Sequence, residues 1–349
     1  QNIHNIVNKY LDFLKGQDFT ELIKEYQTRN KIHFNYSEKP NSFDLASEIV
    51  DYINLTDEYL YFPYDSSGLT SEKIKQYLGK LTKPQIILQI NLDKLKYKKI
   101  EKFHDKYYQM DYYTIQVDDD KHMKDKLDFE ISELNDYIVE PELVELSDSS
   151  MEDKLIIKNG NYYRFNSSWK TPTVYLSFLI PYDDKIPLIH LHGFISVVNQ
   201  KLKHSFQDAF KMYYNIQISF NTSIKSFIIS FSGYNTKIKE LVNDFFTMLT
   251  DEKDLDKYLS LGNDKLHKSL EKSKTATPLK IAYQKFLKVV VPGFKTSLEL
   301  LDDYEPLTEE RYHKMVNDLI SSPRILYQYG NYEHEIKNPN VYELKLIFN

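Results

Sequence analysis

Residues 173–249 constrain the fold of this chain more than any other stretch, because their hydrophobic pattern switches between strand and helix periods in a fixed order. The expected elements are a strand, a long helix, two alternating strands and an amphipathic helix, at 172–180, 187–214, 217–220, 226–232 and 237–249. In the last helix Ile238, Leu241 and Phe245 recur at helical spacing. This order predicts one β–α–β–β–α module.

Helices and short strands are expected on both sides of this module. Upstream, the pattern predicts helices at 3–14, 19–27, 42–50 and 71–81, and strands at 31–36 and 85–91. A strand pair at 155–165 and 172–180 opens the second half, and further helices are expected at 252–274, 278–291, 295–302 and 308–321, before a strand at 324–329. The mixture predicts an α+β fold of two related domains, each a mostly antiparallel sheet covered by helices.

The chain has 349 residues, which is long enough for two domains. The stretch 118–154 is acidic, contains Pro141 and has few apolar residues, as is typical of a connection rather than a core element. We therefore expect a first domain at 1–117, a linker at 118–154 and a second domain at 155–349.

Composition argues against several partners. The net charge is −6, and only four arginines are present, at Arg29, Arg164, Arg311 and Arg324, so no nucleic-acid partner is expected. No apolar run reaches the length of a membrane span. The chain has no cysteine, which leaves no disulfide or thiolate metal site and suits a cytoplasmic protein. It begins at Gln1 without Met, so we expect a processed chain or a piece of a longer protein.

No residue pattern predicts a catalytic or metal site. None of the ten histidines begins a His-x-x-Glu-His motif, and His190 and His192 are two residues apart, which turns them to different sides of a helix. Glu333–His334–Glu335 and Asp118–Asp120 have ligand residue types, but the first lacks further ligands and the second lacks the glycine and glutamate of a calcium loop. Both fit solvated segments. Ser232–Gly233–Tyr234 lacks the surroundings of a nucleophile elbow and is read as a turn.

Tyrosines gather in two clusters that could stack on nucleic-acid bases, and these are Tyr59, Tyr61 and Tyr64, and Tyr107, Tyr108, Tyr112 and Tyr113. Without arginines between them, packing in a core or at a domain interface is the favoured reading.

Nine stretches, taken in order, resemble the insulin-degrading-enzyme branch of the pitrilysin-type (insulinase family) zinc metalloendopeptidases, which includes the fungal pheromone-processing proteases. They are Tyr10–Leu14 with Gly16, Glu25–Tyr36, Lys39–Pro40, Tyr59–Leu60, Leu78–Ile90, Tyr107–Tyr108 with Tyr112, Pro187–Phe220, Gly233–Tyr234–Asn235 and Tyr329–Gly330–Asn331. Gln109 replaces an expected glycine, and Gln85 stands where Asn is common. The resemblance implies the latter part of the family's second domain followed by its third.

The same resemblance implies what the whole protein does. Its parent would have four related domains in two halves that close around a chamber and cleave short peptides, with zinc in a first domain that this chain lacks. A substrate-positioning pair belongs to the fourth domain, also outside the chain. The chain itself would then hold no catalytic residue, no metal ligand and no cofactor, and its substrate-binding residues are unknown. Its partners would be the missing N- and C-terminal domains and short peptides, and a homodimer is compatible with the family.

Two other readings remain open at this stage. The chain could belong to an interaction or scaffold protein that keeps the insulinase-type fold without a peptidase site. An unrelated α+β adaptor is the third reading, and a doubly wound parallel sheet would favour it. Whether the chain belongs to an enzyme therefore depends on sequence outside it.

Overall fold

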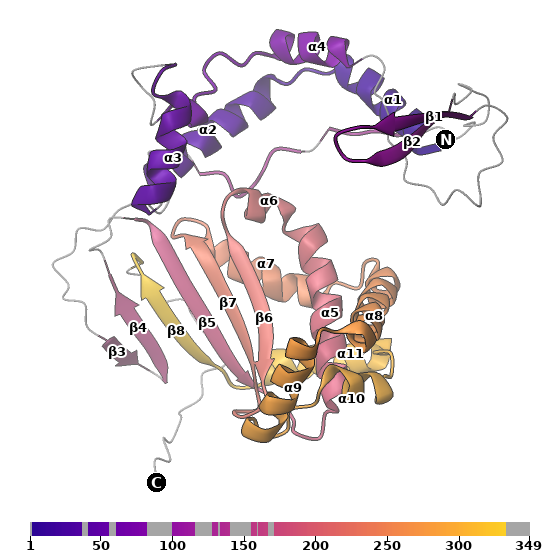
Figure 1. Cartoon of the computed structure of the whole chain (residues 1–349). Coiled ribbons are helices and arrows are strands. Elements are labelled where there is room, and N and C mark those ends of the chain that lie inside the picture. The colour runs from indigo at the N-terminus through magenta and orange to yellow at the C-terminus, as the bar shows by residue number, and fades with distance from the viewer. Residues whose placement is uncertain are drawn as a thin grey trace. The chain divides into compact units, whose positions relative to one another are not determined.

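The computed structural model describes most of the chain, namely residues 2–36, 41–55, 61–81, 100–115, 128–131, 133–139, 155–158, 160–166 and 171–332. The polypeptide divides into two compact units (Figure 1). Unit 1 contains Gln1–Gln27 and Asp65–Leu134, and unit 2 contains Thr28–Tyr64 and Asn135–Asn349. The chain first passes from unit 1 to unit 2 after Gln27, inside the helix Thr20–Tyr36. It returns to unit 1 after Tyr64 and enters unit 2 again after Leu134.

Unit 1 is a small helical cluster followed by a hairpin. Its elements are α1 (Asn2–Lys15), the first half of α2 (Thr20–Tyr36), α4 (Ser71–Lys80), β1 (Ile100–Asp105) and β2 (Met110–Ile115). Phe19, Ile23 and Leu78 form its buried core. The backbone N–H of Phe19 donates to Ser71 Oγ at 3.1 Å, which ties the start of α2 to the start of α4. The helices predicted at 3–14 and 71–81 are confirmed.

The strand predicted at 31–36 is wrong, because these residues continue α2. In a helix, Ile32 and Phe34 point to different sides, and both sides have apolar partners here. Ile32 is buried in the core of unit 2, whereas the Phe34 ring packs edge-on against Tyr61 at 5.0 Å. Because apolar residues lie on two faces of this helix, apolar and polar residues alternate along the sequence as they do in a strand. The strand predicted at 85–91 lies outside the described residues.

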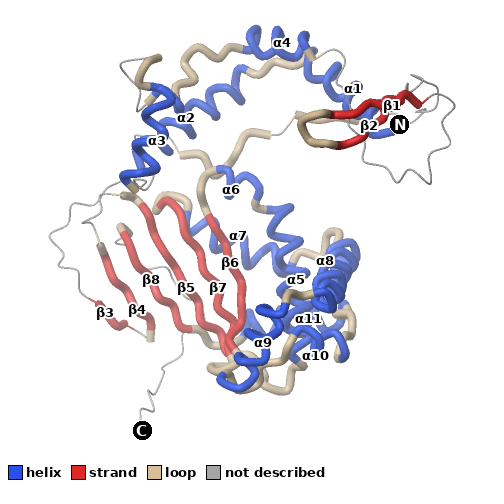
Figure 2. The backbone as a smooth tube through the Cα atoms, in the orientation of Figure 1, coloured by secondary structure: helices blue, strands red, loops and turns tan. Residues whose placement is uncertain are grey.

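Unit 2 is built on a six-stranded sheet with the order β3-β4-β8-β5-β7-β6 (Figures 1 and 2). Its strands are β3 (Leu155–Lys158), β4 (Asn161–Phe165), β5 (Thr173–Pro181), β6 (Asn215–Asn221), β7 (Ser226–Tyr234) and β8 (Ile325–Gly330). Neighbouring strands run antiparallel except β4 and β8, which are parallel. The predicted α+β class is confirmed, and the sheet is not the doubly wound parallel type.

Helices gather against one face of this sheet (Figure 1). They are α5 (Leu188–Ser205), α6 (Gln207–Lys211), α7 (Ile238–Thr250), α8 (Leu255–Glu271), α9 (Pro278–Val290), α10 (Ser297–Asp302) and α11 (Glu309–Ser321), with a short 3₁₀ turn at Lys272–Thr275. Unit 2 also contains α3 (Ser42–Tyr52) and a 3₁₀ turn at Phe62–Tyr64. The core between sheet and helices is made of alternate strand residues such as Leu176 and Phe231 and of helix residues such as Phe194, Leu241 and Phe245. Burial of these apolar side chains is the main stabilising contribution.

The predicted β–α–β–β–α module is confirmed as β5, α5, β6, β7 and α7. Two details differ. The helix expected over 187–214 stops at Ser205, because Phe206 is buried with a non-helical φ of −116° and starts the separate helix α6. The strands expected to pair at 155–165 and 172–180 do not pair, since β3 and β4 pair with each other and β8 lies between β4 and β5.

None of the helices within the described ranges is long and apolar enough to cross a membrane.

Candidate functional site

The face of the unit 2 sheet that points away from the core is the first candidate site. Strand residues alternate between the two faces, so the neighbours of the core residues point outward. In β5 these are Tyr175, Ser177 and Leu179, and the register places Tyr329 and Ser232 beside Tyr175. Figure 2 shows the strands running side by side as one continuous surface. This surface, made by the outward residues of β4, β8, β5, β7 and β6, is called the open face below.

One row of the open face is aromatic and basic. The rings of Tyr175 and Tyr329 lie side by side with centroids 6.2 Å apart. Arg164 on β4 is opposite Tyr329, and its Cζ lies 5.8 Å from that ring. Asn166 Nδ2 donates to Tyr329 Oη at 3.0 Å. This row offers flat rings for apolar groups, and a guanidinium beside them.

The next row carries hydroxyl and amide groups. Ser177 pairs with Ser230 on one side and with Tyr327 on the other, and Ser230 pairs with Gln217. The two serine Oγ atoms are 3.3 Å apart. Tyr175 is 42% exposed and Tyr327 is 40% exposed, so both rings reach solvent. The open face can therefore bind an apolar side chain and hydrogen-bond to a peptide backbone.

Residue periodicity alone did not single out this surface. The signal was present, because Tyr175, Tyr327 and Tyr329 occupy the outward positions of strands whose other positions are apolar. What was missing is the order of the strands, which brings β8 next to β5 from a distant part of the chain. Only this long-range pairing places the three tyrosines together.

The two glycine motifs that carried the family resemblance meet in the fold. Gly233 on β7 and Gly330 on β8 are both register partners of Val174 on β5. A Cβ atom on Gly330, which has φ of +122°, would lie 2.2 Å from the Thr173 carbonyl oxygen. A Cβ atom on Gly233 would lie 2.1 Å from the ring of Tyr214. The close approach of neighbours requires glycine at both positions.

Ser232–Gly233–Tyr234 was read as a turn, and this is wrong because all three residues are the end of β7. The strand continues because the ring of Tyr214 fills the space beside Gly233, and the chain turns afterwards, at Asn235. The Asn235 backbone N–H donates to the Pro172 carbonyl at 2.7 Å, and its side-chain amide donates to the Asn331 carbonyl at 3.0 Å. These bonds give the motif a structural role.

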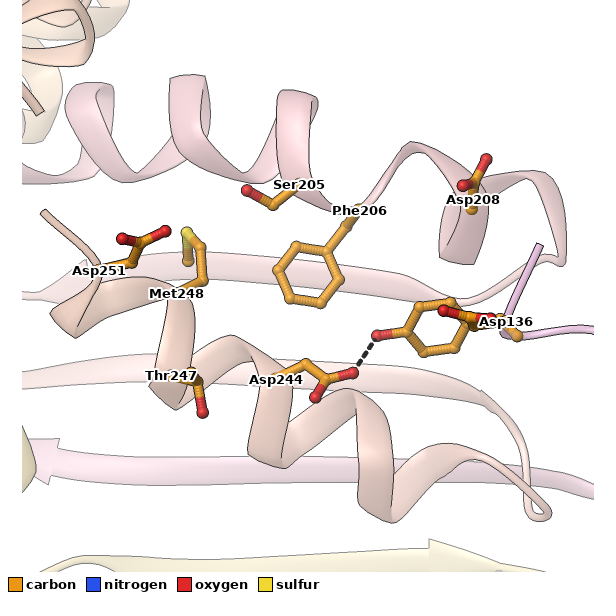
Figure 3. A pocket seen from close by; sticks show the side chains of 9 residues that line it. Asp136, Ser205, Phe206, Asp208, Asp244, Thr247, Met248 and Asp251 are labelled. Atoms are coloured by element: carbon orange, nitrogen blue, oxygen red, sulfur yellow. Dashed lines mark hydrogen bonds between the residues drawn. The ribbon is translucent and has the colours of Figure 1, made fainter. Parts of the chain in front are cut away.

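A second candidate is an acidic pocket of about 400 Å³ on unit 2 (Figure 3). It is lined by Asp136, Tyr137, Ser205, Phe206, Asp208, Asp244, Thr247, Met248 and Asp251. Tyr137 Oη donates to Asp244 Oδ2 at 2.6 Å, as the dashed line in Figure 3 marks. Burial raises the pKa of Tyr137, and the hydrogen bond to Asp244 raises it further. Asp208 forms an ion pair with Lys211 at 2.7 Å. Among the described residues, these aspartates do not form a group of three that could hold a metal ion.

His190 and His192 at the start of α5 have separate surroundings, as their spacing predicted. Arg311 Nη1 lies 2.6 Å from His190 Nε2, and Glu305 Oε2 lies 3.2 Å from the same nitrogen. Burial lowers the pKa of His190, and Arg311 lowers it further while Glu305 opposes the change. A neutral imidazole that accepts from Arg311 fits this arrangement. His192 instead packs edge-on against Phe220 at 4.9 Å, and burial lowers its pKa.

The described residues contain no group of three or more histidine, aspartate or glutamate side chains that could hold a metal ion. Asp118–Asp120 and Glu333–His334–Glu335 lie outside the described residues. Nothing in the described part of the chain therefore fits a resident zinc ion.

The tyrosine clusters have different environments. Tyr61 and Tyr64 pack against Phe34 at 5.0 and 5.6 Å, as the packing interpretation predicts. Tyr107 and Tyr108 are not core residues, because both are exposed at the β1–β2 turn, where the Asp105 carboxylate accepts from both backbone N–H groups. Packing of these two rings at a domain interface stays a prediction. Tyr59 lies outside the described residues.

The family comparison and the structure comparison point to the same group of peptidases. The sequence model described as "Middle or third domain of peptidase_M16" matches residues 34–302. No curated protein sequence matches the chain significantly. Among solved structures, the crystal structure of pitrilysin has a similar fold, with a TM-score of 0.58, 15% sequence identity and coverage of 92% of this chain. The chain spans only 36% of the length of that relative.

Proposed function

Because the chain belongs to the M16 peptidase family and carries its middle or third domain, we propose that it is a non-catalytic wall of a peptide-cleaving chamber. The parent protein would be a zinc metalloendopeptidase that takes short peptides. Membership of the family removes the alternative of an unrelated adaptor. The scaffold reading, in which the fold persists without a peptidase site, becomes an outcome of the test.

The open face is the single observation that carries this proposal. One side of the sheet binds its own helices, while the other presents Tyr175 and Tyr327 to solvent beside the Ser177 and Ser230 hydroxyls. Such a surface can hold an extended peptide by ring contacts and backbone hydrogen bonds without modifying it. Among the described residues of this surface no base lies next to a serine, so it supplies binding rather than bond cleavage.

The cutting chemistry is assigned to a part of the parent outside this chain. In a metallopeptidase of this kind the metal activates a water molecule. The role of the present chain is then to hold substrate and to exclude folded proteins by enclosure. Opening and closing of the parent would control entry.

The test uses the flanking coding sequence and the purified proteins. We expect an intact His-x-x-Glu-His motif upstream of Gln1, chelator-sensitive cleavage of short peptides by the full-length parent, and neither activity nor stoichiometric zinc in the 349-residue chain. Absence of the motif together with an inactive parent supports the scaffold reading instead. Chelator-sensitive cleavage by the isolated chain would overturn the non-catalytic assignment.

A further inference from the structure

Helix α9 (Pro278–Val290) stands out because none of its residues is buried, although much of its sequence is apolar. Leu279 is 81% exposed and Val289 is 85% exposed, and Tyr283, Phe286 and Val290 are also exposed. The helix lies among the outer helices of unit 2 (Figure 1).

Four of the exposed apolar residues form one stripe along the helix, and Val289 lies beside it. Leu279, Tyr283, Phe286 and Val290 follow at spacings of four, three and four residues, which places their side chains on a single face. We call these four residues the α9 stripe. Scattered apolar residues are common on surfaces, but a continuous stripe of large side chains marks an interaction site.

The other side of α9 is attached to unit 2 by polar contacts. Gln284 Nε2 donates to Ser297 Oγ at 2.7 Å, and the Ser297 backbone N–H donates to Gln284 Oε1 at 3.3 Å. Lys288 forms an ion pair with Glu299, the residue that also closes the capping box of α10. These contacts with Lys288 and with Thr296 lower the pKa of Glu299 to about 2. The α9 stripe is therefore held outward by contacts on the opposite side.

The charges around the α9 stripe restrict what can cover it. Lys280 and Lys285 flank the stripe, and α9 contains no acidic residue. The chemistry fits a protein surface with an apolar centre and carboxylates at its rim.

Two other occupants fit less well. A second copy that paired its own α9 symmetrically would bring lysines of both copies together, which is unfavourable. A membrane surface usually requires a cluster of about four to eight basic residues. Here Lys288 is engaged with Glu299, only two lysines flank the stripe, and the whole chain has a net charge of −6.

We propose that the α9 stripe is the docking surface for another domain of the same polypeptide, one that lies outside residues 1–349. This inference rests on the proposed function, because it requires a longer parent. The chain spans 36% of the pitrilysin chain, so a relative of that length has ample additional protein to cover the stripe.

The test places a photoreactive benzoylphenylalanine at position 286 of the full-length parent, with a second protein carrying it at position 261. Leu261 on α8 is 46% exposed and lies on a different helix, so it serves as the matched control. After irradiation, mass spectrometry of the digest is expected to find cross-links from 286, but not from 261, to peptides outside 1–349 of the same polypeptide.

Several results would overturn this proposal. A band of twice the parent mass would assign the α9 stripe to a second copy. Flotation of the parent with vesicles of equal parts phosphatidylcholine and phosphatidylserine, lost in Phe286→Glu, would assign it to a lipid surface. No cross-link above the unirradiated control would leave the stripe without an occupant. The proposed function fails separately, if the flanking sequence lacks a zinc motif while the cross-links to another domain are found.

Discussion

The side-chain amide of Asn235 donates a hydrogen bond of 3.0 Å to the backbone carbonyl of Asn331. This contact joins the residue after β7 to the residue after β8, across the start of β5. The Asn331 backbone N–H in turn donates to the Thr173 carbonyl at 3.1 Å. Three strands are thus held together at one end by Asn235, two residues after Gly233, and by Asn331, directly after Gly330.

Gly330→Ala is expected to lower the free energy of unfolding by roughly 2 kcal/mol or more, because a positive φ and overpacking each cost about 1–3 kcal/mol. The new methyl group would meet the Thr173 carbonyl oxygen. Urea denaturation followed by circular dichroism measures the loss. Gly79→Ala is the control, since a Cβ there has no neighbour within 4 Å and α4 should gain about 0.5–1 kcal/mol. Equal effects of the two substitutions would refute the packing argument.

Tyr137→Phe removes one hydroxyl from the acidic pocket and with it the hydrogen bond to Asp244. We expect a loss of about 1 kcal/mol, below the ~1.5–3 kcal/mol of a buried bond to a charged acceptor, because this bond is exposed to water. Asp244→Asn keeps an acceptor at the same place and should cost less. The same denaturation experiment compares the two proteins, and a larger loss for Asp244→Asn would contradict the assignment.

Stability should fall in mild acid. Burial lowers the pKa of His192 below its ordinary value of 6.5, and the pKa values of His33 and His190 shift in the same direction. Below pH 6.5 the unfolded chain binds protons that the folded chain does not, so stability present above that pH is lost as the pH falls toward the folded pKa. The slope is at most about 1.4 kcal/mol per pH unit for each histidine.

His192→Phe should flatten the decline, since phenylalanine keeps the contact with Phe220 without a titrating group. Unfolding free energies measured between neutral pH and mild acid decide this. The control is His204→Phe, which makes the same replacement near the end of α5. An unchanged slope in His192→Phe would rule out its contribution.

At alkaline pH buried tyrosines should limit stability. Burial raises the pKa values of Tyr214, Tyr234 and Tyr312 above their ordinary value of 10. Their contribution is fully present below pH ~10 and is lost above it, because only the unfolded chain ionises there. Burial lowers the pKa of Lys201 below its ordinary value of 10.5. The effect of this lysine is opposite to that of the tyrosines, because it makes the free energy of unfolding rise as the pH rises toward 10.5.

Absorbance of phenolate at high pH distinguishes the buried tyrosines from exposed ones. The three buried rings should ionise only together with loss of the circular dichroism signal. Reversible titration of all tyrosines with the fold intact would show that the buried rings are accessible.

The open face should contribute to substrate binding in the full-length parent. Tyr175→Ser and Tyr327→Ser each remove an exposed ring, and loss of an aromatic contact of about 0.5–1.5 kcal/mol corresponds to roughly a 2- to 10-fold higher KM. The kcat should change little, because the proposed function assigns the bond cleavage to a part of the parent outside this chain. Tyr77→Ser on α4 is the matched control. Unchanged KM in the Tyr175→Ser, Tyr327→Ser double variant would separate the open face from peptide binding.

The hydrophobic pattern of the sequence correctly predicted those helices whose apolar residues lie on a single buried face. α7, α8 and α11 each have one buried face, and the sequence-based boundaries agree with the structure within a few residues. The same method failed at Lys31–Tyr36, where two faces of α2 are covered, and at Phe206, where no glycine or proline marks the break.

The open face shows a different limit. Strand alternation placed Tyr175 and Tyr329 correctly within their own strands, but their neighbourhood depends on β8 entering the sheet between β4 and β5. Hydrophobic period describes one element at a time and contains no information on which distant strand pairs with it. The α9 stripe was similarly hidden, since a helix that faces a partner has the same pattern as one that faces a core.

The crossing of the chain between units within α2 has a practical consequence for shortened versions of the protein. A polypeptide that starts near Asn135 would keep every strand of the large sheet but would lose Ile32, which is 1% exposed in its core, and the Tyr36 ring beside Tyr234. Such a deletion would leave a cavity in the hydrophobic core of unit 2. Dissection by removal of an N-terminal piece therefore cannot report on either half by itself, and single-residue replacement is the sounder route.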